Sequence, residues 1–208
     1  MRIVGRLSKA IGAISFLALL AGCATNPFQA GAAATIGNHV IKTKEVTSQL
    51  AEIETQLAEA PAQQLQTPSS AQLAQSVLNR LIATDIMGTA VAKLKISVKD
   101  SEVSNLRDSI FQQYGEESVT LQLAAQQGVP KSQLDSFFKL VLSQNYIGTT
   151  LNPKGSPQKQ SEAGANYLIN LAKSADVSVS PRYGVWNPSQ MMASGSDNSL
   201  SFSIAGAQ

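Results

Sequence analysis

The feature that most constrains the fold is a long stretch of helical periodicity that follows Ser69. Apolar residues recur there every three or four positions, and they form one broad stripe: Leu73, Val77, Leu78, Leu81, Ile82, Ile86 and Val91. This spacing places them on one face of a helix. Ser69 with Gln72 three positions later fits a capping box, which indicates where the helix begins. The sequence therefore predicts one long amphipathic helix in this segment.

The same periodicity predicts five more helices. Their predicted ranges are residues 44–59, 100–114, 116–127, 130–148 and 161–175. Gly115 and Gly128 follow the third and fourth helices of the chain, in the place where glycine commonly ends a helix. Thr149 to Gln160 is rich in Gly, Pro and polar residues, so it is predicted to be a loop.

Two short strand segments flank these helices. Ala33 to Ile41 has the pattern of strand, turn and strand, with Gly37-Asn38 as the turn. Val177 to Ser180 alternates apolar and polar residues. Neither segment is stable alone, because each would leave backbone groups unpaired. We therefore predict a mainly α fold of about six amphipathic helices, closed by a small two-stranded sheet that pairs N-terminal and C-terminal segments.

The first residues have the pattern of an export signal. Arg2, Arg6 and Lys9 precede the uncharged apolar run Ile11–Ala21, which is too short for the ~20 residues of a membrane-spanning helix. The run ends in Leu-Ala-Gly immediately before Cys23, the one cysteine of the chain. This arrangement resembles the lipobox of bacterial lipoproteins, in which the cysteine is lipidated and becomes the new N-terminus. The alternative is an ordinary secretory signal followed by a buried cysteine.

The lipobox interpretation changes how the composition is understood. The formal charge of the chain is +2, but the signal holds three cations and no acids, so the slightly basic balance belongs to the signal. Lipid chains would hold the protein at a membrane without spanning it. We expect a signal peptide over residues 1–22, a tether over 23–31, a helical domain over 32–188 and a flexible tail over 189–208. The expected location is the extracytoplasmic face of the cell membrane.

Composition excludes several classes of site. One cysteine rules out an internal disulfide and a multi-cysteine zinc site, and one histidine rules out a multi-histidine metal centre. A charge near zero gives no electrostatic case for nucleic acid. The single histidine, His39, is predicted to be solvated in the hairpin. The sequence contains no glycine-rich phosphate loop and no nucleophile-elbow motif, so we expect no cofactor and no small-molecule substrate.

The order of the segments resembles the N-terminal domain of exported chaperones of the SurA and PrsA type. The resemblance covers nearly the whole chain after the signal, and the residues that carry it are Ala34–Asn38, Ile41, Glu45-Val46, Val77–Ile82, Ile96–Val103, Gln127–Pro130 and Asp176–Trp186. Ser180 and Lys99 depart from the family pattern, and Lys99 leaves Asp100 as the possible helix cap. In longer relatives a parvulin-type prolyl isomerase domain follows the early helices. Here only the 149–160 loop stands at that junction, so we expect no isomerase activity.

The resemblance implies a membrane-anchored, chaperone-like lipoprotein that binds unfolded or newly exported polypeptides without ATP. The alternative is an adaptor or structural lipoprotein that binds one specific partner in the cell envelope. Lipidation is assigned to Cys23. Candidate peptide-binding residues are Phe137, Phe138, Met191 and Met192, whose side chains are large and apolar. Loose packing at the end of the domain is the alternative explanation for the two methionines.

Overall fold

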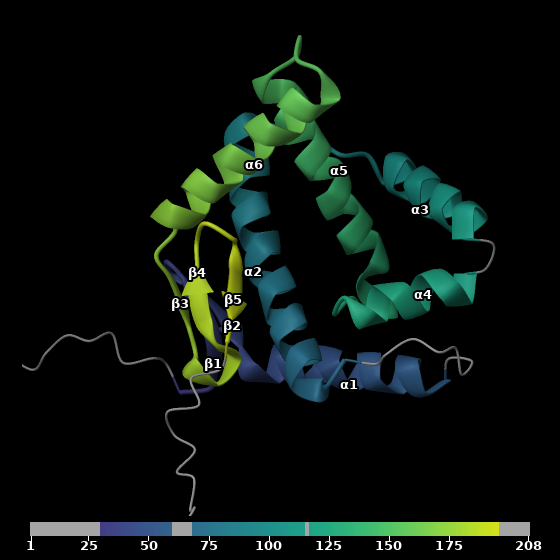
Figure 1. Cartoon of the computed structure of the whole chain (residues 1–208), viewed down its shortest axis with the longest axis vertical. Helices are drawn as coiled ribbons and strands as arrows, with labels where there is room; N and C mark the ends of the chain where they lie inside the picture. The colour runs from purple at the N-terminus through teal and green to yellow at the C-terminus, as the bar shows by residue number, and fades with distance from the viewer. Residues whose placement is uncertain (1–29, 60–67, 115–116, 196–208) are drawn as a thin grey trace, which may run out of the picture.

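The computed structural model describes residues 30–59, 68–114 and 117–195, and within these ranges the fold is mainly helical (Figure 1). The helices are α1 (Thr43–Glu59), α2 (Ser70–Leu94), α3 (Asp100–Tyr114), α4 (Glu117–Gln126), α5 (Leu134–Leu151) and α6 (Pro157–Ser174). Two single turns of 3₁₀ helix are η1 (Lys131–Gln133) and η2 (Pro181–Tyr183). The strands are β1 (Ala32–Ile36), β2 (His39–Lys42), β3 (Val177–Val179), β4 (Val185–Asn187) and β5 (Met192–Ser194). The prediction of six helices is confirmed.

Helix α2 is the central element, and it begins as its sequence predicts. The Ser69 hydroxyl accepts a hydrogen bond from the Gln72 amide, and the Gln72 side chain accepts one from the Ser69 amide, which completes the capping box. At the other end Lys95 adopts the left-handed conformation, with φ of 53°, and its amide bonds back into the last turn. Leu73, Val77 and most of the predicted stripe are buried.

The N-terminal and C-terminal strands pair, as predicted. In the sheet order β2-β1-β3, Ile36 lies opposite Val177 and Ala34 lies opposite Val179, both in antiparallel register. The predicted strand count of two is too low, because the turn at residues 37–38 keeps β2 on the other side of β1 as a third strand.

A second small sheet extends from the predicted domain into the segment where the sequence suggested a tail beginning at residue 189, which contains β5. Strands β4 and β5 form an antiparallel hairpin in which Trp186 lies opposite Ala193. The Asn79 side chain of α2 donates to the Ala193 carbonyl at 3.1 Å and accepts from the Ala193 amide at 2.7 Å. A polar residue on α2 therefore holds β5 against the domain, a long-range contact that local sequence does not reveal.

The connection between α5 and α6 is shorter than predicted. Helix α5 continues to Leu151 and α6 begins at Pro157, so the connection is residues 152–156 and not 149–160. Ser156 caps α6 by accepting from the Lys159 amide, and Pro157 occupies the first turn, where its missing N–H costs nothing. Pro157, one of the residues that suggested a long loop, is a helix start.

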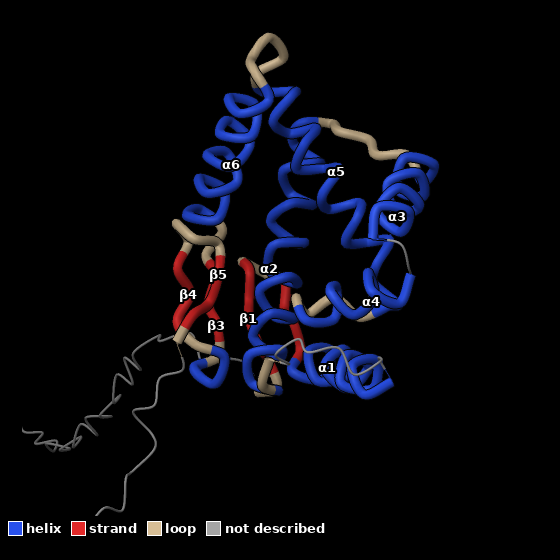
Figure 2. The backbone as a smooth tube through the Cα atoms, turned by 45° about the vertical axis from the view of Figure 1, so that its right-hand side comes forward, coloured by secondary structure: helices blue, strands red, loops and turns tan. Residues whose placement is uncertain are grey.

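The buried apolar residues form two clusters. The main cluster joins the strands to α1, α2, α6 and the last part of α5, and its fully buried members include Val46, Ile53, Leu78 and Ile147. The second cluster lies among α3, α4 and the first part of α5. Figure 1 shows α3 and α4 on the opposite side of α2 from the three-stranded sheet, and in Figure 2 they lie on the opposite side of α2 from β1 and β3. We call α3, α4 and residues 134–146 of α5 the helical arm.

Candidate functional site

The helical arm is organised around its own buried cluster. Its buried members are Val98, Val103, Ala124, Val129, Leu134 and Phe138. Helix α3 contributes only Val103 as a fully buried residue, although Leu106, Ile110 and Phe111 are half-buried against the cluster. The arm is therefore less completely covered than the main core, and apolar side chains remain accessible between its helices.

A hollow of about 350 Å³ opens between the three helices of the arm. We call it the apolar groove, and its lining residues are Leu106, Ile110, Tyr114, Thr120, Leu123, Ala124, Gln127, Leu134, Phe137, Phe138 and Val141. Spacings of three and four residues along each helix bring these side chains to a common face. The Phe137 and Phe138 rings lie 5.9 Å apart at an angle of 53°, and Tyr114 is 49% exposed at the edge.

One polar atom in the wall of the apolar groove lacks a hydrogen-bond partner. Thr120 is buried in α4, and its hydroxyl contacts no donor or acceptor in the described structure. A buried hydroxyl without a partner costs about 1–3 kcal/mol in protein mutational data. The groove wall is therefore not optimised for stability at this position.

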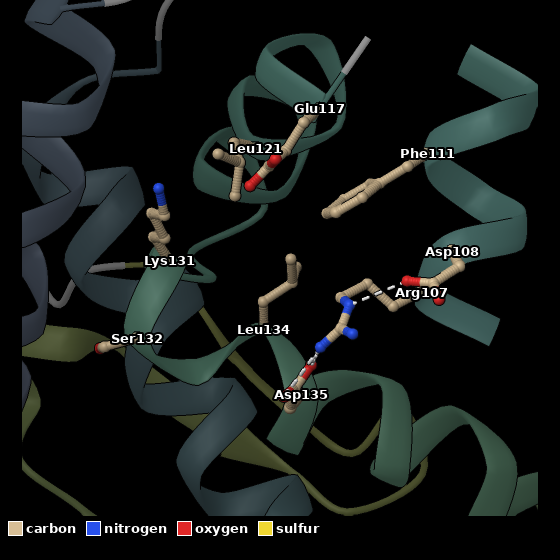
Figure 3. Close-up of a pocket in the computed structure, with 9 residues that line it drawn as sticks. All are labelled: Arg107, Asp108, Phe111, Glu117, Leu121, Lys131, Ser132, Leu134 and Asp135. Atoms are coloured by element: carbon tan, nitrogen blue, oxygen red, sulfur yellow. Dashed lines mark hydrogen bonds and ion pairs between the residues drawn. The ribbon is translucent and has the colours of Figure 1, made fainter. Parts of the chain in front are cut away.

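A second hollow of about 500 Å³ lies beside the apolar groove and shares Leu134 with it. Figure 3 shows Phe111, Leu121 and Leu134 directed toward one another from α3, α4 and α5, with charged side chains around them. Arg107 donates to both carboxylate oxygens of Asp135, at 3.0 and 3.2 Å, and to Asp108 at 3.3 Å. These contacts raise the pKa of Arg107, chiefly through Asp135. The two carboxylates largely neutralise the arginine, so this hollow has an apolar centre, and the charges of Arg107, Asp108 and Asp135 at its rim are paired with one another.

Side chains of α1 connect the arm to the rest of the domain through hydrogen bonds. Gln56 donates to the Leu121 carbonyl and accepts from the Lys131 amide, so one side chain holds both α4 and η1. The Glu52 carboxylate accepts from the amide and the hydroxyl of Ser132.

A carboxylate on α3 joins the start of this helix to α5. The Glu102 carboxylate accepts from the Tyr146 phenol of α5 and from the Lys99 amide. The bond from Tyr146, followed by the bond from Lys99, lowers the pKa of Glu102, and the same bond to Glu102 raises the pKa of Tyr146. Glu102 thus caps the start of α3, where the sequence had suggested Asp100.

The family model described as the SurA-like N-terminal domain matches residues 2–133, well over half of the chain. This chain belongs to the SurA-like N-terminal domain family. The match includes α1 to α4 and η1 of the SurA-like domain, whereas Phe137 and the rest of α5 lie beyond it. The predicted resemblance is confirmed, and the match suggests a chaperone-like function. Only this domain was found, and no parvulin domain was detected.

Searches of the curated proteins and of the solved structures gave no match.

The structure separates the predicted peptide-binding residues into two places. Phe137 and Phe138 both line the apolar groove of the SurA-like domain. Met191 and Met192 lie in the β4–β5 hairpin, on the side of α2 that holds the sheets (Figure 1). Met191 packs on the main core with a φ of 52°, and Met192 is 41% exposed. The four residues therefore do not form one surface.

Other groove residues carry a signal in the sequence. Leu106, Ile110 and Tyr114 recur every four positions along α3. Thr120, Leu123 and Ala124 of α4, with Gln127 just after it, follow a similar spacing. This periodicity shows which residues share a helix face, but it does not show that the face borders a hollow.

Two further predictions concern Cys23 and His39. Cys23 lies outside the described residues. His39 is exposed in β2, as predicted, but its Nδ1 lies 3.0 Å from the Asp85 carboxylate of α2, a contact that sequence reasoning missed.

Within the described ranges, no group of three His, Cys, Asp or Glu residues could hold a metal. None of the described helices is long and apolar enough to cross a membrane.

Proposed function

We propose that this chain is a chaperone-like protein that binds unfolded or newly exported polypeptides in the apolar groove. The observation that carries the proposal is the groove itself, a hollow lined by side chains of three helices in a member of the SurA-like N-terminal domain family. Apolar side chains left accessible on a folded domain are typical of surfaces that bind other polypeptides. The partners would be segments with exposed apolar side chains.

The dimensions of the groove suit transient binding. Its volume of about 350 Å³ lies near the lower end of the roughly 300–1,000 Å³ usual for ligand sites. Burial of one large apolar side chain contributes about 1.5–3 kcal/mol, from which the cost of ordering the bound segment is subtracted. A segment held by one or two side chains dissociates readily, so release of the bound polypeptide needs no ATP.

The proposal includes a membrane anchor at Cys23. The lipobox-like sequence supports lipidation of this cysteine and a location on the extracytoplasmic face of the cell membrane. An anchored domain would meet polypeptides as they emerge from the membrane.

The test is suppression of aggregation of a reduced, unfolded model protein by the full-length chain. Leu123→Gln places a polar group in the apolar groove, and Leu151→Gln makes the same exchange at the exposed end of α5 as a control. We expect the wild type and the control to suppress aggregation equally, and the Leu123 variant to need several-fold more protein. Equal activity of all three, or no suppression at several-fold excess, contradicts the proposal.

The adaptor hypothesis makes a different prediction for crosslinking in intact cells. A chaperone should capture many unrelated exported proteins, and Leu123→Gln should reduce all of them together. One stoichiometric partner that is retained by the variant would favour the adaptor.

A further inference from the structure

A second surface, separate from the helical arm, lies between the hairpin strand β2 and helix α2. It is a hollow of about 500 Å³ that we call the β2–α2 groove, and its lining residues are His39, Ile41, Glu45, Leu81, Thr84, Asp85, Gly88, Thr89 and Ala92. None of these residues lines the apolar groove. The β2–α2 groove is therefore a second surface, distinct from the apolar groove.

Gly88 forms part of this groove, although nothing in the fold requires a glycine there. It lies in the middle of α2, and a Cβ added at this position would meet no atom within 4 Å. A glycine inside a helix costs about 1 kcal/mol relative to alanine. By contrast, a Cβ on Gly148 or Gly164 would press on the neighbouring helix. The effect of Gly88 is to leave α2 bare where another backbone could approach closely.

Among the described strands, β2 provides an open sheet edge beside this bare surface. The order β2-β1-β3 places β2 at the end of the sheet. Ile36 and His39 flank the two-residue turn and form the first pair of the hairpin. In such hairpins the first pair exchanges hydrogen bonds and the next residue directs its N–H and C=O outward. Val40 therefore presents its backbone groups to a further strand.

The charges that line the groove are acidic. Glu45 and Asp85 are among its lining residues, and no lysine or arginine is. The Asp85 side chain is 28% exposed, and its contact with His39 is made through Oδ1. Arg80 interacts with the Glu45 charge, but its guanidinium is bonded to Gln49 and to the Gly128 carbonyl. Asp85 is thus the main acceptor for an incoming cation.

We propose that the β2–α2 groove docks an extended segment of a partner protein that carries apolar side chains and a lysine or arginine on one face. The segment would add a strand to β2, pack its apolar side chains over Gly88, Leu81 and Ala92, and pair its cation with Asp85. Main-chain bonds supply affinity in this mode of recognition, and side-chain contacts supply specificity.

The experiment uses isotope-labelled full-length protein in a non-ionic detergent and two synthetic peptides. The first is acetyl-TVTKTVT-amide, whose Val, Lys and Val lie on one strand face, and the second is acetyl-TVTETVT-amide, which replaces the cation by an anion. We expect the first peptide to shift the backbone amide resonances of residues 39–42 and 84–92. We expect the second to bind at least about tenfold more weakly, which corresponds to about 1.4 kcal/mol.

Gly88→Leu is the decisive variant, because it fills the groove and also favours the helix. We expect its thermal midpoint to be no lower than that of the wild type and its affinity for the lysine peptide to fall at least about tenfold. Ala51→Leu, on an exposed face of α1, is the control and should bind normally. Equal binding of the two peptides, unchanged binding by Gly88→Leu, or shifts confined to α3–α5 would overturn the proposal. A wild-type dimer that Gly88→Leu dissociates would assign the groove to a second copy and would also overturn it.

Discussion

The Tyr146 phenol of α5 donates a hydrogen bond to the Glu102 carboxylate at the start of α3. The bond joins two helices of the arm, and its two residues are 44 positions apart in the chain. The Lys99 amide donates to the second oxygen of the same carboxylate. A carboxylate that accepts two hydrogen bonds is stabilised in its charged form.

This pairing predicts a specific pH dependence. The pKa of Glu102 is lowered in the folded state, so its contribution to stability is complete above the ordinary glutamate pKa of about 4.3 and is lost as the pH falls through the lower folded-state value. Tyr146→Phe removes the main cause. We expect its free energy of unfolding in urea to be lower at pH 7 and to fall less between about pH 5 and pH 3 than that of the wild type. Tyr114→Phe, at an exposed tyrosine, is the control. Parallel pH curves for wild type and Tyr146→Phe would contradict the assignment.

The crossing of α5 and α6 depends on two glycines. A Cβ on Gly148 would collide with the Gln160 carbonyl oxygen, and one on Gly164 would lie 3.2 Å from the Gly148 amide nitrogen. Gly148→Ala should therefore lower the free energy of unfolding by about 1–3 kcal/mol, because backbone must move. Gly88→Ala is the matched control in open space and should raise it by up to about 1 kcal/mol. Thermal unfolding of both variants checks the prediction, and a change of the same sign in both would refute it.

Gln56 should be important for positioning the arm. Its side chain makes two hydrogen bonds, to the Leu121 carbonyl and from the Lys131 amide, and Gln56→Ala leaves both backbone groups without this partner. Each such bond contributes about 0.5–1.5 kcal/mol, so the variant should lose about 1–3 kcal/mol of stability. Hydrogen exchange should increase in α4 and η1 more than in α2. Gln113→Ala, on the exposed face of α3, should change neither quantity.

The anchor proposal is tested by Cys23→Ser. If Cys23 carries lipid, the variant should leave the membrane fraction or retain an uncleaved signal, because serine cannot form the thioether. Intact-mass measurement of the wild type should show acyl chains on a chain that begins at residue 23. An unmodified cysteine inside a longer processed chain would refute the proposal.

Local sequence was sufficient to predict the six helices, although not the boundary between α5 and α6. The capping box at Ser69 and the stripe on α2 are determined by residues within one or two helical turns of each other, so they appear in the sequence directly. The pairing of β1 with β3 followed from a simpler requirement, since backbone groups at either end of the domain needed a partner. The error at residues 149–160 arose because Pro157 can either break a helix or begin one.

The sequence by itself determined which faces of the helices are apolar and that the chain resembles the SurA-like family. Only the tertiary structure decided that Phe137 and Phe138 border a hollow, whereas Met191 and Met192 lie apart from it in the β4–β5 hairpin. It also decided that Asn79 holds β5 and that His39 orients Asp85. The physical reason is that periodicity reports the direction of a side chain relative to its own helix. Whether that face is covered depends on which distant segment packs against it, and each of these contacts joins residues far apart in the chain.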